Sequence, residues 1–169
     1  VLDLGCGFGW HCIYAAENGA SQVTGIDLSE KMIQRAKEQT KHNNVEYKIM
    51  PIEDIDFPGG SFDIVLSSLA FHYIKDFDVI CKKIYNFLTD TGTFVFSCEH
   101  PIFTSEGPQD WHYGENGEKL HWPVDRYFEE SEREAVFLGE HITKYHRTLS
   151  SYITPVISAG FKIEKLVEP

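Results

Sequence analysis

The run Asp3-Leu4-Gly5-Cys6-Gly7-Phe8-Gly9 constrains this chain most, because it puts a glycine at every second position directly after an apolar segment. Glycine tolerates positive φ and lets a ligand approach the backbone where a Cβ would collide. The dinucleotide fingerprint reads G-x-G-x-x-G, whereas this run reads G-x-G-x-G and begins with an acidic residue. An acid at the position of Asp3 suits a ligand that carries an ammonium group better than one that carries a pyrophosphate.

A second acidic residue, Asp27, ends the next apolar segment, about twenty residues after the glycine turn. A carboxylate at the tip of the second strand of a βαβ unit can accept hydrogen bonds from both ribose hydroxyls. The alternative is that Asp27 caps the following helix, but Ser29 lies closer to the helix start and is the better N-cap. We therefore expect an adenosine-containing ligand with a free ribose.

The charge balance and the cysteines narrow the class of protein. Fifteen basic and 26 acidic side chains leave a net charge of −11, which repels nucleic acid and anionic membranes, so we expect neither as a partner. No apolar run approaches the length of a membrane span. The four cysteines form no C-x-x-C pair, and we expect neither a metal site nor a disulfide framework. This composition is typical of a reduced, cytoplasmic protein.

Strand and helix patterns alternate through the first hundred residues. Strands are predicted over residues 1–4, 22–26, 45–50, 61–67 and 93–98, and helices over 10–18, 30–42 and 77–88. A helix at 148–159 and a strand at 161–167 follow later. This alternation predicts an α/β fold with a doubly wound, mostly parallel sheet and helices on both faces. Ligands bind such a sheet at the carboxyl ends of its strands. There Leu28 and Ile52 could sandwich a flat base, although core packing explains each equally well.

The chain resembles the class I S-adenosylmethionine-dependent methyltransferases, in particular the small bacterial type 11 methyltransferase domains. The resemblance rests on residues 1–9, 25–32, 53–63, 67–73 and 88–95, which carry the family's motifs in the family's order. It implies a Rossmann-like fold and the cofactor S-adenosylmethionine. It also implies an enzyme that transfers a methyl group by an SN2 step to an oxygen, nitrogen or carbon nucleophile of a small-molecule acceptor.

The resemblance also implies the roles of individual residues. The expected cofactor-binding residues are Asp3, Gly5, Cys6, Gly7, Asp27, Leu28, Met32, Ile52, Glu53 and Ser67. The Gly5 turn would contact the methionine portion, Asp27 the ribose, and Leu28 with Met32 the adenosine, while Ser67 would lie near the sulfonium. The family often has an aspartate just before the position of Ile52, where this chain has Pro51. Either Glu53 replaces that contact to the adenine or the contact is absent.

Residues 99–145 depart from the alternation and are rich in aromatic residues and histidine. Two strands, at 120–129 and 134–145, are predicted there, joined by a polar turn at 130–132. We interpret the segment as a cap insertion that closes an acceptor pocket; alternatively its aromatic residues form a small core or a dimer contact. The expected domains are a cofactor-binding core (1–98), the cap (99–145) and a C-terminal helix and strand that complete the core (146–169).

Two histidines are candidates for a general base, because His72 and His100 follow the fourth and fifth strands and histidine titrates near neutral pH. Each could equally be structural.

The resemblance further implies a segment before Val1 and a strand after Pro169, so we expect a core truncated at both ends, which puts its own activity in question. An unprotected sheet edge would favour a homodimer. The alternative functions are a non-catalytic S-adenosylmethionine-binding or scaffold module and, less consistent with the glycine spacing, an NAD-dependent oxidoreductase.

Overall fold

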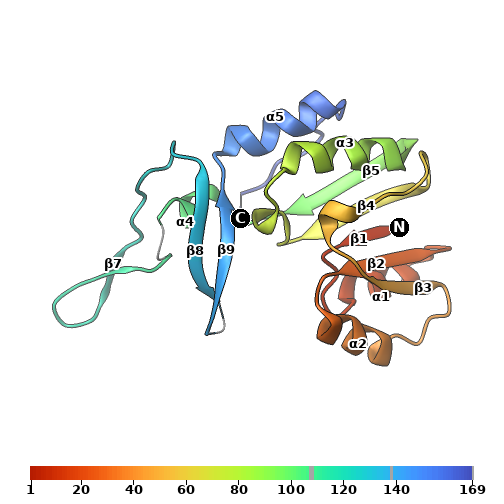
Figure 1. Cartoon of the computed structure of the whole chain (residues 1–169), viewed down its shortest axis with the longest axis horizontal. Helices are drawn as coiled ribbons and strands as arrows, with labels where there is room; N and C mark the ends of the chain where they lie inside the picture. Colours follow the sequence, from red (N-terminus) through yellow and green to blue (C-terminus); the bar gives the residue numbers. More distant parts are fainter. Residues whose placement is uncertain (107–108, 138, 169) are drawn as a thin grey trace. The chain divides into compact units, whose positions relative to one another are not determined.

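The computed structural model describes residues 1–106, 109–137 and 139–168 (Figure 1). Contacts divide the chain into two compact units. The first unit comprises Val1–Phe71 and Asp76–Cys98, and the second comprises His72–Lys75 and the residues from Glu99 onward. Each unit is described by itself.

The first unit contains one parallel sheet of five strands. These are β1 (Leu2–Leu4), β2 (Val23–Asp27), β3 (Val45–Ile49), β4 (Phe62–Ser68) and β5 (Leu88–Ser97). Their order is β3-β2-β1-β4-β5, and each neighbouring pair is parallel. The chain builds outward from β1 to β3 and then returns to the other side of β1, so the switch in strand order lies between β1 and β4. The predicted α/β, Rossmann-like fold is confirmed.

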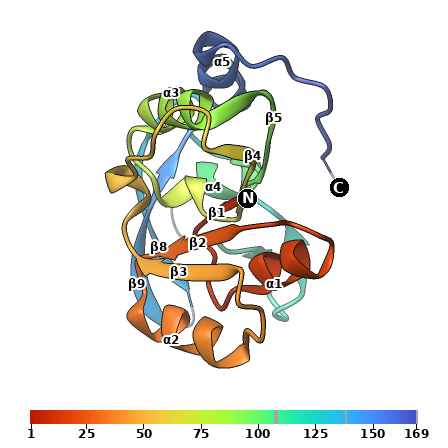
Figure 2. The same cartoon turned by 90° about the vertical axis from the view of Figure 1, so that its right-hand side faces the viewer.

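Helices cover both faces of this sheet (Figure 2). They are α1 (Trp10–Glu17), α2 (Glu30–Gln39) and α3 (Phe77–Phe87), with short 3-10 turns η1 (Ile52–Asp54) and η2 (Phe71–Tyr73). One buried cluster joins Cys12 of α1 and Ile33 of α2 to Val23 and Tyr47 of the sheet, so α1 and α2 share a face. On the other face Phe77 of α3 contacts Phe96 of β5, with ring centroids 5.7 Å apart.

Two boundaries in the first unit differ from the prediction. Helix α2 ends at Gln39 rather than at residue 42, because Thr40 takes an extended conformation with φ −83° and ψ 124°. Strand β5 begins at Leu88 rather than at residue 93, and its register with β4 shifts between Phe62 and Ile64.

The second unit consists of short elements. They are α4 (Pro101–Ser105), β6 (His112–Tyr113), β7 (Lys119–His121), β8 (Ser131–Phe137), β9 (Glu140–His146) and α5 (Leu149–Ala159). Strands β6 and β7 form one antiparallel pair, and β8 and β9 form another that runs from Ser131 opposite His146 to Phe137 opposite Glu140. The aromatic-rich insertion after the fifth strand is therefore built mainly from two small hairpins and a short helix.

The predicted strands at 120–129 and 134–145 and the turn at 130–132 were wrong. Strand β8 begins at Ser131, where the turn was expected. The polar side chains there have partners: a carboxylate oxygen of Glu130 accepts from Thr148 N at 2.8 Å, and the Arg133 guanidinium donates to the carbonyl oxygen of Glu129 at 2.8 Å. Polarity at these positions therefore reflects hydrogen bonding within the unit rather than a turn.

The predicted strand at 161–167 was also wrong, since residues 161–168 have no regular secondary structure. An apolar alternation becomes a strand only when the backbone finds a neighbour to pair with. By their contacts, the residues from 146 onward belong to the same unit as residues 99–145.

Among the described residues, no helix has the length and apolar character needed to cross a membrane.

Candidate cofactor site

The glycine turn between β1 and α1 takes a conformation that glycine adopts most easily. Gly5, Gly7 and Gly9 have φ values of +75°, +52° and +83°. The backbone N–H groups of Gly5 and Cys6 both donate to the carbonyl oxygen of Ile26, at 2.9 and 2.8 Å. These bonds attach the turn to the end of β2, next to the predicted ribose acid.

The three glycines have different surroundings. A Cβ at Gly5 would lie 2.7 Å from Cβ of Ala70, and one at Gly9 would overlap the hydroxyl of Tyr47. A Cβ at Gly7 would meet none of the described residues within 4 Å. Gly5 and Gly9 are therefore required by packing, whereas Gly7 borders open space where a ligand can approach the backbone.

The carboxylate of Asp27 connects the turn with the start of α2. Its Oδ2 accepts from Gly7 N and its Oδ1 accepts from Ser29 N, both at 2.8 Å. Ser29 caps α2, because its hydroxyl oxygen accepts from Met32 N at 3.3 Å, as predicted. Each carboxylate oxygen still has a second acceptor position, which leaves Asp27 able to bind the two hydroxyls of a ribose.

Asp3 is a fully buried acid on β1. Its Oδ2 accepts from the thiol of Cys12 at 3.4 Å, and its Oδ1 has no hydrogen-bond partner among the described residues. Burial raises the pKa of Asp3 to about 7; the Cys12 hydrogen bond opposes this rise, and the negative charge of Asp27 adds to it. An orphaned acid beside the glycine turn fits a ligand with an ammonium group, because a positive charge would stabilise its ionised form.

Large apolar side chains are exposed just past the ends of β2 and β4. Leu28 is 71% exposed, Met32 43% and Leu69 55%. Exposed apolar side chains beside a glycine turn are typical of a site that a ligand covers. Ile52 differs, since it is buried with its Cδ1 3.7 Å from where a Gly5 Cβ would lie. Ile52 therefore packs against the glycine turn at Gly5.

The other three predicted residues lie around this edge. Cys6 is buried in the turn. The hydroxyl of Ser67 donates to the carbonyl oxygen of Leu4 at 2.7 Å and so joins β4 to β1. Glu53 has an exposed side chain, and its carbonyl oxygen accepts from the Lys83 ammonium at 2.8 Å. All ten predicted cofactor residues belong to the first unit.

Both candidate general bases lie in the second unit with both ring nitrogens in polar contacts. Nδ1 of His72 accepts from Glu99 N at 3.4 Å, and its Nε2 lies 4.0 Å from Oε1 of Glu99. Nδ1 of His100 accepts from Ile102 N at 3.2 Å, and its Nε2 lies 2.6 Å from Oε1 of Glu168. A neutral ring that accepts on Nδ1 carries its proton on Nε2. Neither ring then has a free lone pair for a substrate proton.

His72 belongs to a polar cluster around the buried ammonium of Lys144. That ammonium donates to both carboxylate oxygens of Glu99, at 2.6 and 2.8 Å, and to Oε1 of Gln109 at 2.9 Å. Burial lowers the pKa of His72 to about 4; Glu99 opposes this fall, and Lys144 contributes to it. His72 is therefore neutral at physiological pH.

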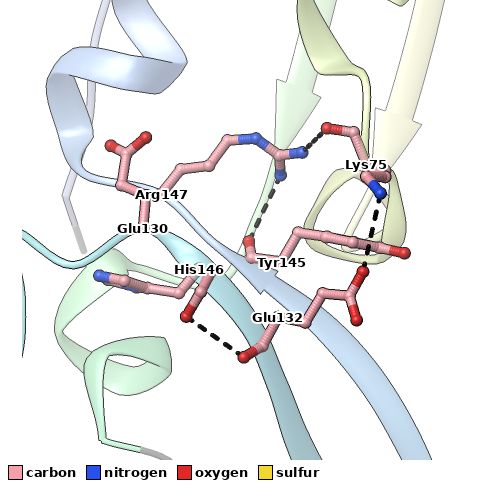
Figure 3. Close-up of a pocket in the computed structure, with 7 residues that line it drawn as sticks. Lys75, Glu130, Glu132, Tyr145, His146 and Arg147 are labelled. Carbon is pink, nitrogen blue, oxygen red and sulfur yellow. Dashed lines mark hydrogen bonds and ion pairs between the residues drawn. The ribbon is translucent and has the colours of Figure 1, made fainter.

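A pocket of about 260 Å³ also lies in the second unit, between residues 130–132 and 145–147 (Figure 3). Its charged groups contact protein partners: Lys75 pairs with Glu132 at 3.9 Å, and the guanidinium of Arg147 donates to the carbonyl oxygens of Ile74 and Lys75. These contacts tie segment 72–75 to the β8–β9 hairpin, so we assign the pocket a structural role.

Sequence reasoning missed two residues that shape the first-unit site. Tyr47 contacts Gly9, and Cys12 donates to Asp3. A tyrosine within an apolar strand pattern could have indicated the first. Nothing in the sequence distinguished Cys12 from an ordinary core residue.

The comparisons with known proteins identify the family. The model of the methyltransferase domain family matches residues 2–96. A solved S-adenosylmethionine-dependent methyltransferase from Mesorhizobium loti is 40% identical, with a TM-score of 0.88 over 97% of this chain and 74% of that chain. A solved protein from Listeria monocytogenes, assigned to the same class, is 57% identical, with a TM-score of 0.95 over 99% of this chain and 79% of that one.

The chain therefore belongs to the methyltransferase domain family, and its resemblance to class I S-adenosylmethionine-dependent methyltransferases is confirmed. An uncharacterized protein of Haemophilus influenzae is 36% identical over 177 residues, covering all of this chain and 69% of that protein. The chain spans only 21% of a phosphoethanolamine N-methyltransferase of Arabidopsis thaliana and 38% of a ubiquinone biosynthesis O-methyltransferase of Bradyrhizobium diazoefficiens.

Proposed function

We propose that this chain binds S-adenosylmethionine at the carboxyl edge of its sheet and transfers the methyl group to a small-molecule acceptor. One observation carries the proposal: the Asp27 carboxylate holds the backbone of Gly7 and of Ser29 and keeps acceptor positions for a ribose. The orphaned carboxylate of Asp3 and the open space at Gly7 fit the amino-acid end of the same cofactor.

We propose a role for each predicted cofactor-binding residue. The turn of Gly5, Cys6 and Gly7 lies against the methionine portion, and Asp3 balances its ammonium charge. Asp27 holds the ribose, while Leu28 and Met32 cover the adenosine. Ile52 supports the turn from below, Glu53 lies beside the adenine, and Ser67 fixes the tip of β4.

The sulfonium of the bound cofactor supplies a strongly electrophilic methyl group. The chain's own task is therefore to hold donor and acceptor in line and to keep water out. His72 and His100 act in our proposal as positioning residues rather than as bases, since their ring nitrogens already contact backbone and carboxylate partners.

The acceptor is proposed to be recognised by the insertion at 99–145. Its aromatic residues form a cluster: Trp122 contacts Phe103 and Trp111 with ring centroids 5.1 and 5.6 Å apart, and its indole N–H donates to the carbonyl oxygen of Ile102 at 3.1 Å. Trp111 is partly exposed and offers a surface for an apolar or flat acceptor. The matched enzymes named above include both N- and O-methyltransferases, which supports a nitrogen or an oxygen nucleophile.

The first test is calorimetric titration with S-adenosylhomocysteine and with NAD, using Asp27→Ala as the control. We expect the homocysteine ligand alone to bind, and the variant to lose it. Binding of NAD instead would favour an oxidoreductase, and binding of neither would contradict the proposed cofactor site. Cofactor binding without methyl transfer to any offered amine or alcohol would favour a non-catalytic module.

A further inference from the structure

The segment 50–57, which connects β3 with β4, is anchored at both ends. At its start, the backbone N–H of Met50 donates to the carbonyl oxygen of Asp27 at 3.0 Å. At its end, the ring of Phe57 contacts the ring of Phe87 in α3, with centroids 5.5 Å apart. The segment therefore extends from the predicted ribose acid to helix α3.

Between these anchors, one side chain of α3 holds the backbone of the segment. The ammonium of Lys83 donates to the carbonyl oxygen of Glu53 at 2.8 Å and to that of Ile55 at 3.0 Å. These carbonyl groups lie where η1 ends, and carbonyl groups at a helix end have no partner within the helix. Hydrogen bonds from a charged donor are stronger than those between neutral groups. Lys83 therefore fixes the direction of the peptide groups that follow Glu53 and Ile55.

Lys83 binds the backbone of Glu53 and leaves its carboxylate available to a ligand. The side chain of Glu53 is exposed, and no described residue forms an ion pair or a hydrogen bond with its carboxylate. A carboxylate accepts hydrogen bonds, and the amino group of adenine donates them. Pro51, at the position before Ile52, offers no side-chain acceptor. The direction in which Glu53 points therefore decides whether this segment can recognise the amino group of the base.

We propose that Lys83 is a positioning residue for recognition of the adenine: by holding the backbone at Glu53, it directs the Glu53 carboxylate toward the amino group of the base. This inference rests on the proposed function, in which Glu53 lies beside the adenine. Without the two hydrogen bonds the turn would have to be ordered when the ligand binds, and this ordering would cost affinity. A lysine on α3 thus sets the selectivity for the base through Glu53.

Apolar contacts make the fold largely independent of Lys83. Ile55 is fully buried, and the ring of Phe57 packs edge-on against the rings of both Phe62 and Phe87. Lys83→Met keeps an apolar side chain of similar length and removes both hydrogen bonds. The variant should therefore fold, with Tm lowered by roughly 2–4 °C.

The test compares binding of S-adenosylhomocysteine with binding of S-inosylhomocysteine, in which a carbonyl oxygen replaces the amino group of the base. By calorimetric titration the wild type should prefer S-adenosylhomocysteine about tenfold. Lys83→Met should reduce this preference about fivefold, and Lys83→Arg, which can still donate to both carbonyl oxygens, should restore most of it. In a Glu53→Ala background, Lys83→Met should not change the preference further, because Lys83 acts through Glu53.

Lys82→Met is the matched control, because Lys82 is the neighbouring lysine of α3 and its exposed ammonium pairs with Asp78 at 3.6 Å. It should leave the preference unchanged. A wild-type preference in Lys83→Met would overturn the inference, even if Tm falls, and so would an equal loss of affinity for both ligands. Equal binding of the two ligands by the wild type would overturn it as well, since Glu53 would then not recognise the base. If the wild type binds neither ligand, the proposed function itself fails.

Discussion

The hydroxyl of Tyr47 donates a hydrogen bond of 3.4 Å to the carbonyl oxygen of Gly9, 38 residues away in the sequence. The same hydroxyl lies 2.8 Å from Oγ1 of Thr40, at the end of α2. A residue at the centre of β3 therefore holds the last glycine of the turn, and it occupies the space that a Cβ at position 9 would need. The turn is shaped by β3 as well as by its own glycines.

Gly9→Ala should therefore destabilise the fold strongly. The new Cβ would overlap Tyr47 and would sit on a backbone with φ +83°, so we expect a loss of about 3 kcal/mol or more. Chemical denaturation measures this loss. The double variant Gly9→Ala/Tyr47→Phe should recover part of it, because the overlapping hydroxyl is gone. No recovery would show that backbone strain, rather than the overlap, sets the cost.

Gly7→Ala should separate ligand binding from stability. Gly7 and Gly19 both have positive φ, and a Cβ at either would meet no described residue within 4 Å. Both alanine variants should lose about 1–2 kcal/mol of stability through backbone strain. Only Gly7→Ala should also lose affinity for S-adenosylhomocysteine, because its Cβ enters the space that we assign to the ligand. Equal affinities in the two variants would remove Gly7 from the site.

Asp3→Asn should change how stability depends on pH. The folded-state pKa of Asp3 is about 7 and its ordinary value is 3.8, so the folded protein holds an extra proton between these values. Asp3 therefore contributes stability at low pH that is lost as the pH rises from about 4 to 7. The asparagine variant should lack this decline. Tm measured across this range for both proteins checks it, and identical profiles would mean that Asp3 does not titrate there.

His72→Gln should change the pH dependence in the opposite direction. The pKa of His72 is about 4 in the folded protein and 6.5 ordinarily, so the unfolded chain binds the extra proton. His72 thus contributes stability above pH 6.5 that is lost as the pH falls toward 4. Tm profiles should show a weaker acid-side loss in His72→Gln. A profile as steep as that of the wild type would assign the loss to other groups.

The opposite slopes of Asp3 and His72 overlap between about pH 4 and 6.5. Their contributions partly cancel in the wild type, which should show a flatter profile than either single variant. A wild-type profile steeper than both would contradict the pair of assignments. This comparison needs no cofactor and no acceptor.

The first unit could be predicted from the sequence because its signals are local and mutually consistent. The apolar strand before Gly5, the acid at Asp27 and the cap at Ser29 each identify a junction between a strand and a helix. All three lie where the βαβ pattern requires them. Right-handed crossovers then account for α1 and α2 sharing one face of the sheet.

The second unit could not be predicted as well, because its elements depend on partners distant in the sequence. Glu130 pairs with Thr148, and Lys144 pairs with Glu99, 45 residues apart. Polar residues at the start of β8 thus resembled a turn, and the alternation at 161–167 resembled a strand. The positive φ of Leu69, +55°, could not be predicted either, because the partner of its N–H is the carbonyl oxygen of Ser97, 28 residues away.

The carboxylate of Asp27 braces the glycine turn and the start of α2 before any ligand arrives. Its loss would therefore release the backbone at Gly7 and also remove the proposed ribose contact, so an alanine substitution measures both effects together. The preorganised turn should bind a rigid ligand at a low entropic cost, and weakening the brace should shorten the lifetime of the complex more than it slows association. The effect of Asp27→Ala on affinity would therefore combine two contributions, the order of the turn and the proposed contact with the ribose. A single substitution does not separate them.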